Sequence, residues 1–405
     1  MDRRKAHPLV NVLFIAVCAV LSGAEGWKSI ETFGRAKKRW LAQYLELPDG
    51  PHPVPSDDTY RRTISRLDPA AFEEVFRAWV ASLAEHIEGE VIALDGKSLR
   101  GSRDRDEATL NPAPSGEAPS GEAHNEEAPP EHGAPPEHGA PQKPLHLVSA
   151  WACEQRLVLA QQAVDAKTNE ITVLPDLLRM LELEGCLVTI DAMGTQKTIA
   201  EQIRERGGDY VLALKSNHPR LYGDVKTHFA DVVDRGLPDL DSSHTREVDG
   251  GHGRVEVRAC WATGDIAWLD RRDQWSGLQS IAMVQATRQE HRWQEHRWDE
   301  EAGKRVWSTT TERRYYISSL PADAERIGTA VRAHWGIENR MHWVLDVSFS
   351  EDASRIRKRN GPENVSVLRR IAMNMIRQDE RAGSLRQKRK RAGWDDEYRE
   401  QILGI

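Results

Sequence analysis

Three carboxylates in this sequence are placed where they could share one site. Asp95 follows the apolar run "VIAL", Asp191 follows "LVTI", and a glycine comes within three residues of each acid. In sheets covered by helices, ligand sites lie beyond the carboxyl ends of the strands, so these two acids are candidates for a common site. Either acid alone is weak support, because Asp often ends a strand by accepting turn hydrogen bonds.

Glu338 is the third candidate, in the segment "HWGIENRMHWVLDVSFSED". A 3.6-residue repeat predicts that Glu338 faces inward with an apolar stripe. The other members of that stripe are Ile327, Val331, His334, Met341 and Leu345. An unpaired buried carboxylate is costly, and the simplest partner is Arg332 or Arg340. A cation shared with the two aspartates would satisfy all three acids together.

Three neighbours compete with Glu338 for the third position: Asp346, Glu351 and Asp352. The stripe favours Glu338, and we expect Asp352 to pair with the basic run that begins at Arg355. The flanking Trp335 and Trp343 are interpreted as core residues, although a tryptophan here can also stack on a displaced base.

Three hard oxygen donors favour Mg²⁺ or Mn²⁺ over a softer metal. Two such ions about 3.5–4 Å apart activate an attacking oxygen and stabilise the leaving oxygen in phosphoryl transfer. The four cysteines stand far apart without metal or redox spacing, which argues against zinc and is typical of a cytoplasmic protein. The apolar run from Leu9 is interpreted as a buried helix rather than a signal peptide or membrane span.

The sequence predicts an α/β chain with several parts. Residues 1–88 have helical patterns, including Asp68 as N-cap before Pro69, and their paired basic residues are a possible DNA contact. Residues 89–380 alternate strands and helices, which indicates a mixed sheet with helices on its faces. Within this domain, residues 217–316 are β-rich and contain no long periodic helix, so we expect an inserted subdomain.

Charge divides the chain further. Residues 101–142 are Pro-, Gly- and Glu-rich with tandem duplications, and we expect a disordered acidic insertion that is passive, although an autoinhibitory role is an alternative. Residues 355–391 hold 13 Lys and Arg against three acids, a net charge of +10. Such a segment is either a basic face for a polyanion or a solvated helical surface. Residues 381–405 are expected to form a basic tail.

Several motifs closely resemble the DDE transposases of the ISAs-one insertion-sequence family, also called H-repeat-associated proteins. They include "IALDGKSLRGS", "KTNEI", "VTIDAMGTQ", "LKSNHP", "HGRVEVR", "HWGIENRMHW" and "LDVSFSED", and the resemblance runs from about residue 3 to about residue 377. The resemblance implies an RNase H-like core in which Asp95, Asp191 and Glu338 bind two Mg²⁺ or Mn²⁺ ions. The long insertion after Asp95 departs from the short connection expected in the family.

The implied activity is transposition: metal-dependent cleavage of double-stranded DNA at the ends of an element, then attack of the freed 3′-hydroxyl on target DNA. A homodimer or higher synaptic complex in the cytoplasm, without membrane, would join two ends. Polar residues in turns are candidates for DNA contacts; they are Lys97, Arg100, Lys167, Lys215, Asn217, His252 and Arg254. A nuclease without strand transfer and a non-catalytic DNA-binding relic of a mobile element remain alternatives.

Overall fold

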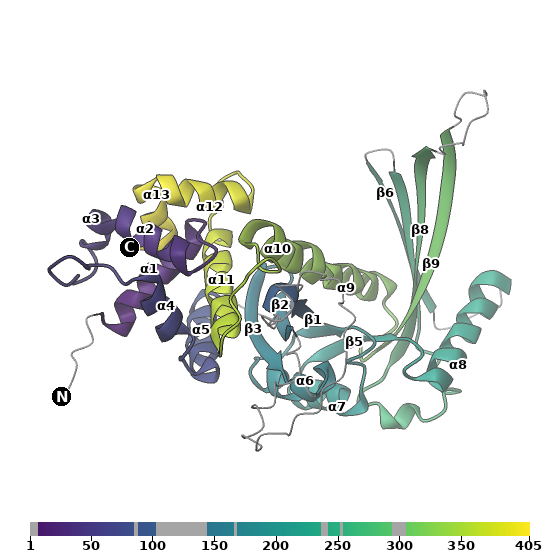
Figure 1. The fold of residues 1–405 in the computed structure, drawn as a ribbon. Helices are drawn as coiled ribbons and strands as arrows, with labels where there is room; N and C mark the ends of the chain where they lie inside the picture. The colour runs from purple at the N-terminus through teal and green to yellow at the C-terminus, as the bar shows by residue number, and fades with distance from the viewer. Residues whose placement is uncertain are drawn as a thin grey trace, which may run out of the picture.

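The computed structural model describes residues 7–84, 88–102, 144–165, 168–235, 242–251, 254–293 and 305–405, and side chains of 290–307 lie outside that description. Figure 1 shows a helical domain at one end and a large mixed sheet with flanking helices at the other. The predicted insertion lies outside the described residues from residue 103 onward. No helix among the described residues is long and apolar enough to cross a membrane.

The sheet has nine strands in the order β3-β2-β1-β4-β5-β9-β8-β7-β6. Its first five strands are β1 (Val91–Leu99), β2 (Leu145–Ala152), β3 (Leu157–Val164), β4 (Leu187–Ile190) and β5 (Asp209–Leu214). β1 pairs antiparallel with β2 and parallel with β4, and β4 pairs parallel with β5. This 3-2-1-4-5 order is RNase H-like and confirms the expected mixed-sheet core.

Helices cover both faces of this core. α6 (Glu170–Arg179) and α7 (Lys197–Glu205) lie on one face, and α9 (Ala324–Gly336) lies on the other (Figure 1). α9 continues through the π-helical turn η5 (Ile337–His342) into α10 (Trp343–Phe349). The strands between the helices are short and almost wholly buried, as expected for a sheet that is covered on both faces.

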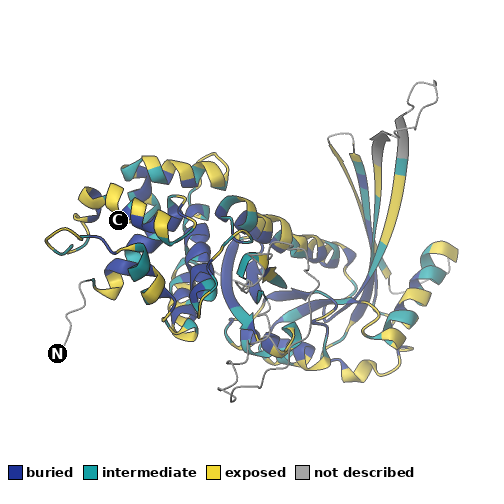
Figure 2. Cartoon of the chain, in the orientation of Figure 1, coloured by how far each residue is buried: buried dark blue, intermediate teal, exposed yellow. Residues whose placement is uncertain are grey.

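The β-rich insertion is an extension of the same sheet. β9 (Arg305–Ser318) pairs with β5, and β8 (Ser280–Trp293), β7 (Arg254–Thr263) and β6 (Ser242–Gly251) follow as an antiparallel meander. These strands project beyond the core, and β6 is largely exposed (Figure 2). The expectation of no long helix is wrong, because α8 (Pro219–Phe229) begins at Pro219 and buries Val225 and Phe229.

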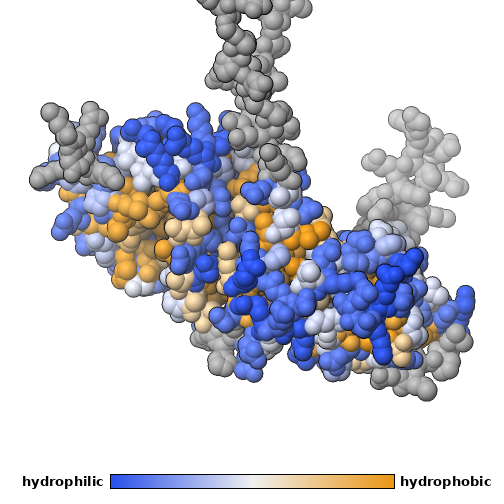
Figure 3. Space-filling model, turned by 90° about the horizontal axis from the view of Figure 1, so that it is seen from below, coloured by the Kyte–Doolittle hydropathy of each residue, from blue (hydrophilic) through white to orange (hydrophobic). Residues whose placement is uncertain are grey.

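The helical domain combines both ends of the chain. Its N-terminal part contains α1 (Leu9–Leu21), α2 (Trp27–Ala36), α3 (Lys38–Leu41), α4 (Asp57–Ile64) and α5 (Pro69–Leu83). The predicted cap is confirmed, because the Asp68 side chain accepts a hydrogen bond from the amide of Ala70 before α5. α1 is the predicted buried helix. In a view from below, apolar residues gather over this domain, whereas hydrophilic residues cover most of the face beneath the sheet (Figure 3).

The expectation of a basic tail over 381–405 is wrong. This segment folds into α12 (Leu385–Trp394) and α13 (Asp396–Leu403), which pack with α11 (Gly361–Arg377) onto the N-terminal helices. Arg389 is buried and donates to the carbonyl of Val20, and the guanidinium of Arg399 lies 3.9 Å from the ring centre of Trp40. Arginine can be buried in this way when carbonyl acceptors and an aromatic face replace water.

The helical domain also seals the edge strand β3. Asn374 on α11 donates to the carbonyl of Val158 at 2.9 Å and accepts from its amide at 3.0 Å. Glu73 on α5 accepts from the amide of Gln161 at 2.8 Å. An open strand edge invites pairing with other chains, so these side chains both block the edge and fix the helical domain against the sheet.

Burial raises the pKa of Glu73 to about 8. A carboxyl whose pKa is raised by folding contributes its full stability below its unfolded pKa, near 4.3, and loses that contribution as the pH rises through 8. We therefore expect Glu73→Gln, which stays neutral, to become more stable relative to the native protein between pH 5 and pH 8.5, by about 1–3 kcal/mol. Thermal unfolding midpoints across this range measure the difference. The exposed neighbour variant Glu74→Gln is the control, and parallel curves for Glu73→Gln and the native protein would contradict the expectation.

Candidate active site

The parallel pairing of β1 and β4 brings the two aspartates to one edge of the sheet. Leu94 lies opposite Ile190 in the register, so Asp95, within β1, and Asp191, directly after β4, lie at the same level. Glu338 lies on η5, in the helix that crosses this edge. All three acids line a single cavity of about 200 Å³. The structure thus brings together the three residues that sequence spacing predicted for one site.

Asp191 belongs to a tight turn as well as to the cavity. Its Oδ1 accepts from the amides of Met193 at 3.0 Å and Gly194 at 3.3 Å. A Cβ atom on Gly194 would come 2.3 Å from Ile190 Cγ2, so the turn requires glycine there. The turn interpretation of this aspartate is correct, and it uses only one carboxylate oxygen.

Glu338 is not the buried member of an apolar stripe, and that prediction is wrong. Glu338 is exposed, whereas the neighbouring residue Ile337 is buried. Glu338 lies in a π-helical turn, whose wider spacing departs from the regular 3.6-residue repeat. Ile327 before the turn, Met341 within it and Leu345 after it are buried, as predicted.

The expected arginine partners of Glu338 are also engaged differently. Arg332 pairs with Glu247 at 2.7 Å and with Asp249 at 3.4 Å. Within the described part of the chain, Glu338 makes no ion pair with Arg332 or Arg340. Its carboxylate therefore faces the cavity region without a neutralising cation from its own helix.

Two histidines lie beside the aspartates. His334 Nδ1 lies 3.0 Å from Thr189 Oγ1, and burial lowers the His334 pKa although Asp95 and Asp191 oppose that shift. His342 Nε2 lies 3.2 Å from Asp95 Oδ2, but without the angles of a hydrogen bond. Sequence reasoning placed His334 only in the stripe and gave His342 no role, because a ring that packs against a strand distant in sequence leaves no local pattern.

β9 supplies further residues that sequence analysis missed. Arg314 and Tyr316 line the same cavity as the acids. The Arg314 guanidinium lies 4.2 Å from the ring centre of Trp335. The interpretation of Trp335 and Trp343 as core residues is wrong, because they are 38% and 58% exposed.

Lys97, two residues after Asp95, connects β1 to the segment that follows Glu338. Its ammonium contacts Asp346 and lies 3.6 Å from Glu351 Oε2, and its side chain is 10% exposed. Glu351 is fully buried, and although burial opposes its ionisation, Arg370 and Lys97 lower its pKa to about 2. Asp346 and Glu351, both considered as rivals of Glu338, are therefore partners of basic residues in the fold.

The other residues considered for DNA contact lie in different surroundings. Lys215 is exposed and lines the cavity of the acids, whereas the Asn217 side chain bonds to the carbonyl of Ala192 and the amide of Lys215. Arg254 begins β7 in the projecting meander. Lys167 and His252 lie outside the described residues.

Arg100 is highly exposed, and its Nε lies 3.8 Å from Asp352 Oδ2. Its amide also donates to Asp352 Oδ1, at 3.4 Å. The expectation that Asp352 pairs with the basic run from Arg355 is therefore wrong. The partner comes instead from the end of β1, which lies beside Asp352 in the fold but far from it in the sequence.

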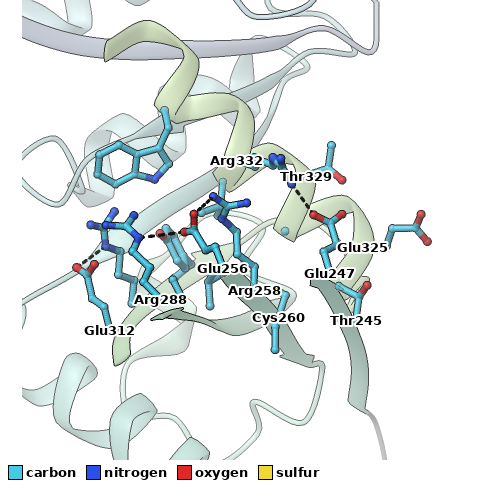
Figure 4. Close-up of a pocket in the computed structure, with 18 of the residues that line it drawn as sticks. Thr245, Glu247, Glu256, Arg258, Cys260, Arg288, Glu312, Glu325, Thr329 and Arg332 are labelled. Carbon is cyan, nitrogen blue, oxygen red and sulfur yellow. Dashed lines mark hydrogen bonds and ion pairs between the residues drawn. The ribbon is translucent and has the colours of Figure 1, made fainter. Parts of the chain in front are cut away.

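A second cavity of about 190 Å³ adjoins the first, between α9 and strands β6 to β9 (Figure 4). The two cavities share Arg314, Tyr316, Val331 and Trp335. Most charged residues of the second cavity are already paired: Glu256 bridges Arg258 at 2.7 Å and Arg288 at 3.1 Å (Figure 4). This cavity is thus a polar hollow with balanced charge rather than a simple cationic pocket.

The three acids supply the type of oxygen donor that divalent metal ions require, but the structure does not arrange them as a formed metal site. Carboxylate oxygens are the donors that Mg²⁺ and Mn²⁺ prefer. Asp191 Oδ2 and the Glu338 carboxylate have no hydrogen-bond or ion-pair partner among the described residues. No group of three His, Cys, Asp or Glu side chains in the described part of the chain is close enough together to hold a metal. The acids therefore line the cavity without forming a closed set of ligands.

An RNase H-like sheet with one acid within β1, one directly after β4 and a third on the crossing helix defines a class of nucleic-acid-cleaving enzymes. Residues 87–375 match the family model described as "Transposase DDE domain", and residues 1–80 match the model of its associated domain, DDE_Tnp_1-associated. The chain belongs to the DDE transposase family.

Relatives agree with this family over almost the whole chain. The chain is 36% identical over 399 residues to "Putative transposase YncI" of Escherichia coli O157:H7, covering 98% of this chain and 89% of the relative. It is 35% identical over 402 residues to "H repeat-associated putative transposase YhhI" of Escherichia coli strain K12, covering 98% and 92%. A piggyBac transposase synaptic complex with hairpin DNA gives a TM-score of 0.39 at 10% identity, covering 100% of this chain and 76% of that chain.

The surroundings of Lys97 lead to a prediction about its role. Lys97→Met would remove a cation from buried Glu351, so we expect a loss of about 1–3 kcal/mol in stability and a lower thermal unfolding midpoint. We expect the salt dependence of DNA binding to stay unchanged. Lys215→Met is the matched control, because this lysine is exposed and lines the cavity of the three acids. A reduced salt slope for Lys97→Met with unchanged stability would instead make Lys97 a phosphate contact.

Proposed function

We propose that this protein is an active insertion-sequence transposase that cuts double-stranded DNA at the ends of its element and joins the freed 3′ ends to target DNA. The observation that supports it best is that Asp95, Asp191 and Glu338 line one cavity. The acids come from three different elements, and only the folded chain brings them together.

The three acids would hold two divalent ions, which supply activation of the attacking oxygen and stabilisation of the leaving oxygen when bound. The residues of the chain contribute the surroundings. Lys215 and Arg314 line the cavity and would lie beside the anionic oxygens of a bound phosphodiester. Thr189 holds the ring of His334 against the strand that ends at Asp191. Asp191 is itself oriented by two backbone amides, which leaves its second oxygen for the substrate side.

Water is the nucleophile of the first step and the freed 3′-hydroxyl is the nucleophile of the second. In the first step the water oxygen bonds to phosphorus and the 3′ oxygen leaves, which gives a 3′-hydroxyl and a 5′-phosphate. In the second step that 3′-hydroxyl bonds to a target phosphorus and the target's own 3′ oxygen leaves as a hydroxyl. Both steps replace an ester oxygen on phosphorus, so the same acids serve both. Two element ends must be processed together, and we propose a homodimer or a larger synaptic complex for that reason.

The test is cleavage of labelled duplexes that carry the terminal sequences of the encoding element, with Mg²⁺ or Mn²⁺. We expect the native protein to cut and to form joined products, and Glu338→Gln to lower the rate at least 10²-fold, because a residue that acts on the reacting atoms contributes several kcal/mol. Glu201→Gln, an exposed glutamate on α7, is the matched control and should cut like the native protein.

Each other outcome selects a different function. Cutting without joining would identify a nuclease that lacks strand transfer. Equal cutting by the native protein and Glu338→Gln would remove Glu338 from the site. Metal-independent, specific binding without any cutting would identify a DNA-binding relic of a mobile element.

A further inference from the structure

The loop between α10 and α11, residues 350–360, presents three cations to solvent. Arg355, Lys358 and Arg359 are exposed, and none of them has an ion-pair partner among the described residues. The loop lies where the helical domain meets the sheet (Figure 1). Exposed cations are common on protein surfaces and do not by themselves form a site. Two further observations decide whether these three cations do: how the loop is held, and how far it lies from the acids.

The loop has a fixed shape. Buried Glu351 accepts hydrogen bonds from Ser366 at 3.2 Å and Arg370 at 3.0 Å, and Ile356 is buried as well. At the far end, the Asn360 side chain donates to the carbonyl of Leu67 at 2.9 Å. These anchors point into the protein, whereas the three cations between them point outward.

Backbone strain marks the same segment. Ser350 and Arg359 both have a φ of 52°, in the left-handed region that non-glycine residues rarely adopt. Strained backbone persists only where the surrounding contacts hold it, and it occurs most often at functional sites. The buried anchors supply those contacts here, so the backbone that carries the three cations has a set shape before any partner binds.

The loop also contacts the 3-10 turn η1 (Arg100–Ser102), which directly follows the strand that carries Asp95. Arg357 Nε donates to the carbonyl of Gly101 at 3.0 Å. A Cβ atom on Gly101 would come 2.4 Å from the carbonyl oxygen of Ser354, so the two segments are in close backbone contact. Six residues of extended chain span at most about 20 Å, which limits the distance from Asp95 to this loop. Arg100 is exposed beside the same loop, where its Nε lies 3.8 Å from Asp352 Oδ2.

Most other cations of the basic segment 355–391 have partners inside the fold, and the exceptions Arg386 and Lys390 are exposed on α12. Arg369, Arg370 and Arg389 are buried. Arg381 and Lys388 both pair with Asp379. The net charge of this segment therefore does not form one basic face, and the loop concentrates its unpaired cations near the candidate active site.

We propose that loop 350–360 binds the phosphate backbone of the substrate duplex through Arg355, Lys358 and Arg359, within about six nucleotides of the scissile phosphate. The limit takes the distance above as a separation along the duplex axis, with about 3.4 Å of axial rise per phosphate of one strand. This inference rests on the proposed function, since it takes the acids as the place of cutting. Contacts to phosphates position a duplex without reading its sequence, so this loop would set where the DNA lies relative to Asp95.

The test compares two variants of equal charge. Arg355→Gln/Lys358→Gln/Arg359→Gln removes the loop cations, and Arg220→Gln/Arg326→Gln/Arg386→Gln removes three exposed arginines on α8, α9 and α12. Binding to duplexes with the element ends is measured without metal over a range of salt concentrations. Three lost phosphate contacts lower the slope of log K against log salt by about 2.7, whereas the control variant should keep the native slope.

Ethylation of single phosphates locates the contacts. We expect interference within about six nucleotides of the cutting position with the native protein, and none there with the loop variant. Equal slopes for the loop variant and the native protein, or equal reductions in both variants, would overturn the proposal. A lower thermal unfolding midpoint for the loop variant alone would also count against it, because the cations would then serve the fold.

Failure of this inference is separable from failure of the proposed function. The binding measurement uses no metal and no cutting, so it does not depend on Glu338. If Glu338→Gln cut normally, the assignment of the acids would fall while a changed salt slope for the loop would stand.

Discussion

The arrangement of the site depends on the parallel pairing of β1 with β4. Four residue pairs, from Val91 with Leu187 to Leu94 with Ile190, set the register. A shift by one residue would turn one aspartate to the opposite face of the sheet, because side chains alternate along a strand. The buried apolar residues of both strands prevent that shift, so the core fixes the relation between Asp95 and Asp191. The rest of the structure positions Glu338 against this pair.

The parts of the site that depend on local pattern were predictable. The strands before Asp95 and Asp191 are short apolar runs, and the α5 cap is a single Asp-Pro signal. The exposure of Glu338 was not predictable, because the π-helical turn breaks the regular repeat on which the stripe depended. The partners of Lys97 were also hidden, since Asp346 lies 249 residues further along the chain. Contacts between segments so distant in sequence leave no periodic signal.

The same reason explains the C-terminal helices. A segment rich in Arg and Lys is usually solvated, so 381–405 was predicted to be a tail. In the structure, Arg389 and Arg399 are buried against carbonyl oxygens and the rings of Phe349 and Trp40. Composition records the charge of these residues but not the acceptors that the N-terminal helices and α10 provide. The helical domain therefore requires both ends of the chain, and its side chains in turn close the edge of β3.

Charged groups in this protein fall into two kinds with different surroundings. The buried ones, such as Glu351 with Arg370 and Lys97, have several partners each, as a low-dielectric interior requires. The acids that line the cavity have fewer partners: Glu338 is exposed, and Asp191 uses one oxygen to accept from two backbone amides. The ion pairs of Glu351 with Lys97 and Arg370 tie β1 and α11 to the segment that follows α10, so the acids of the cavity are carried by elements that other charges hold in place.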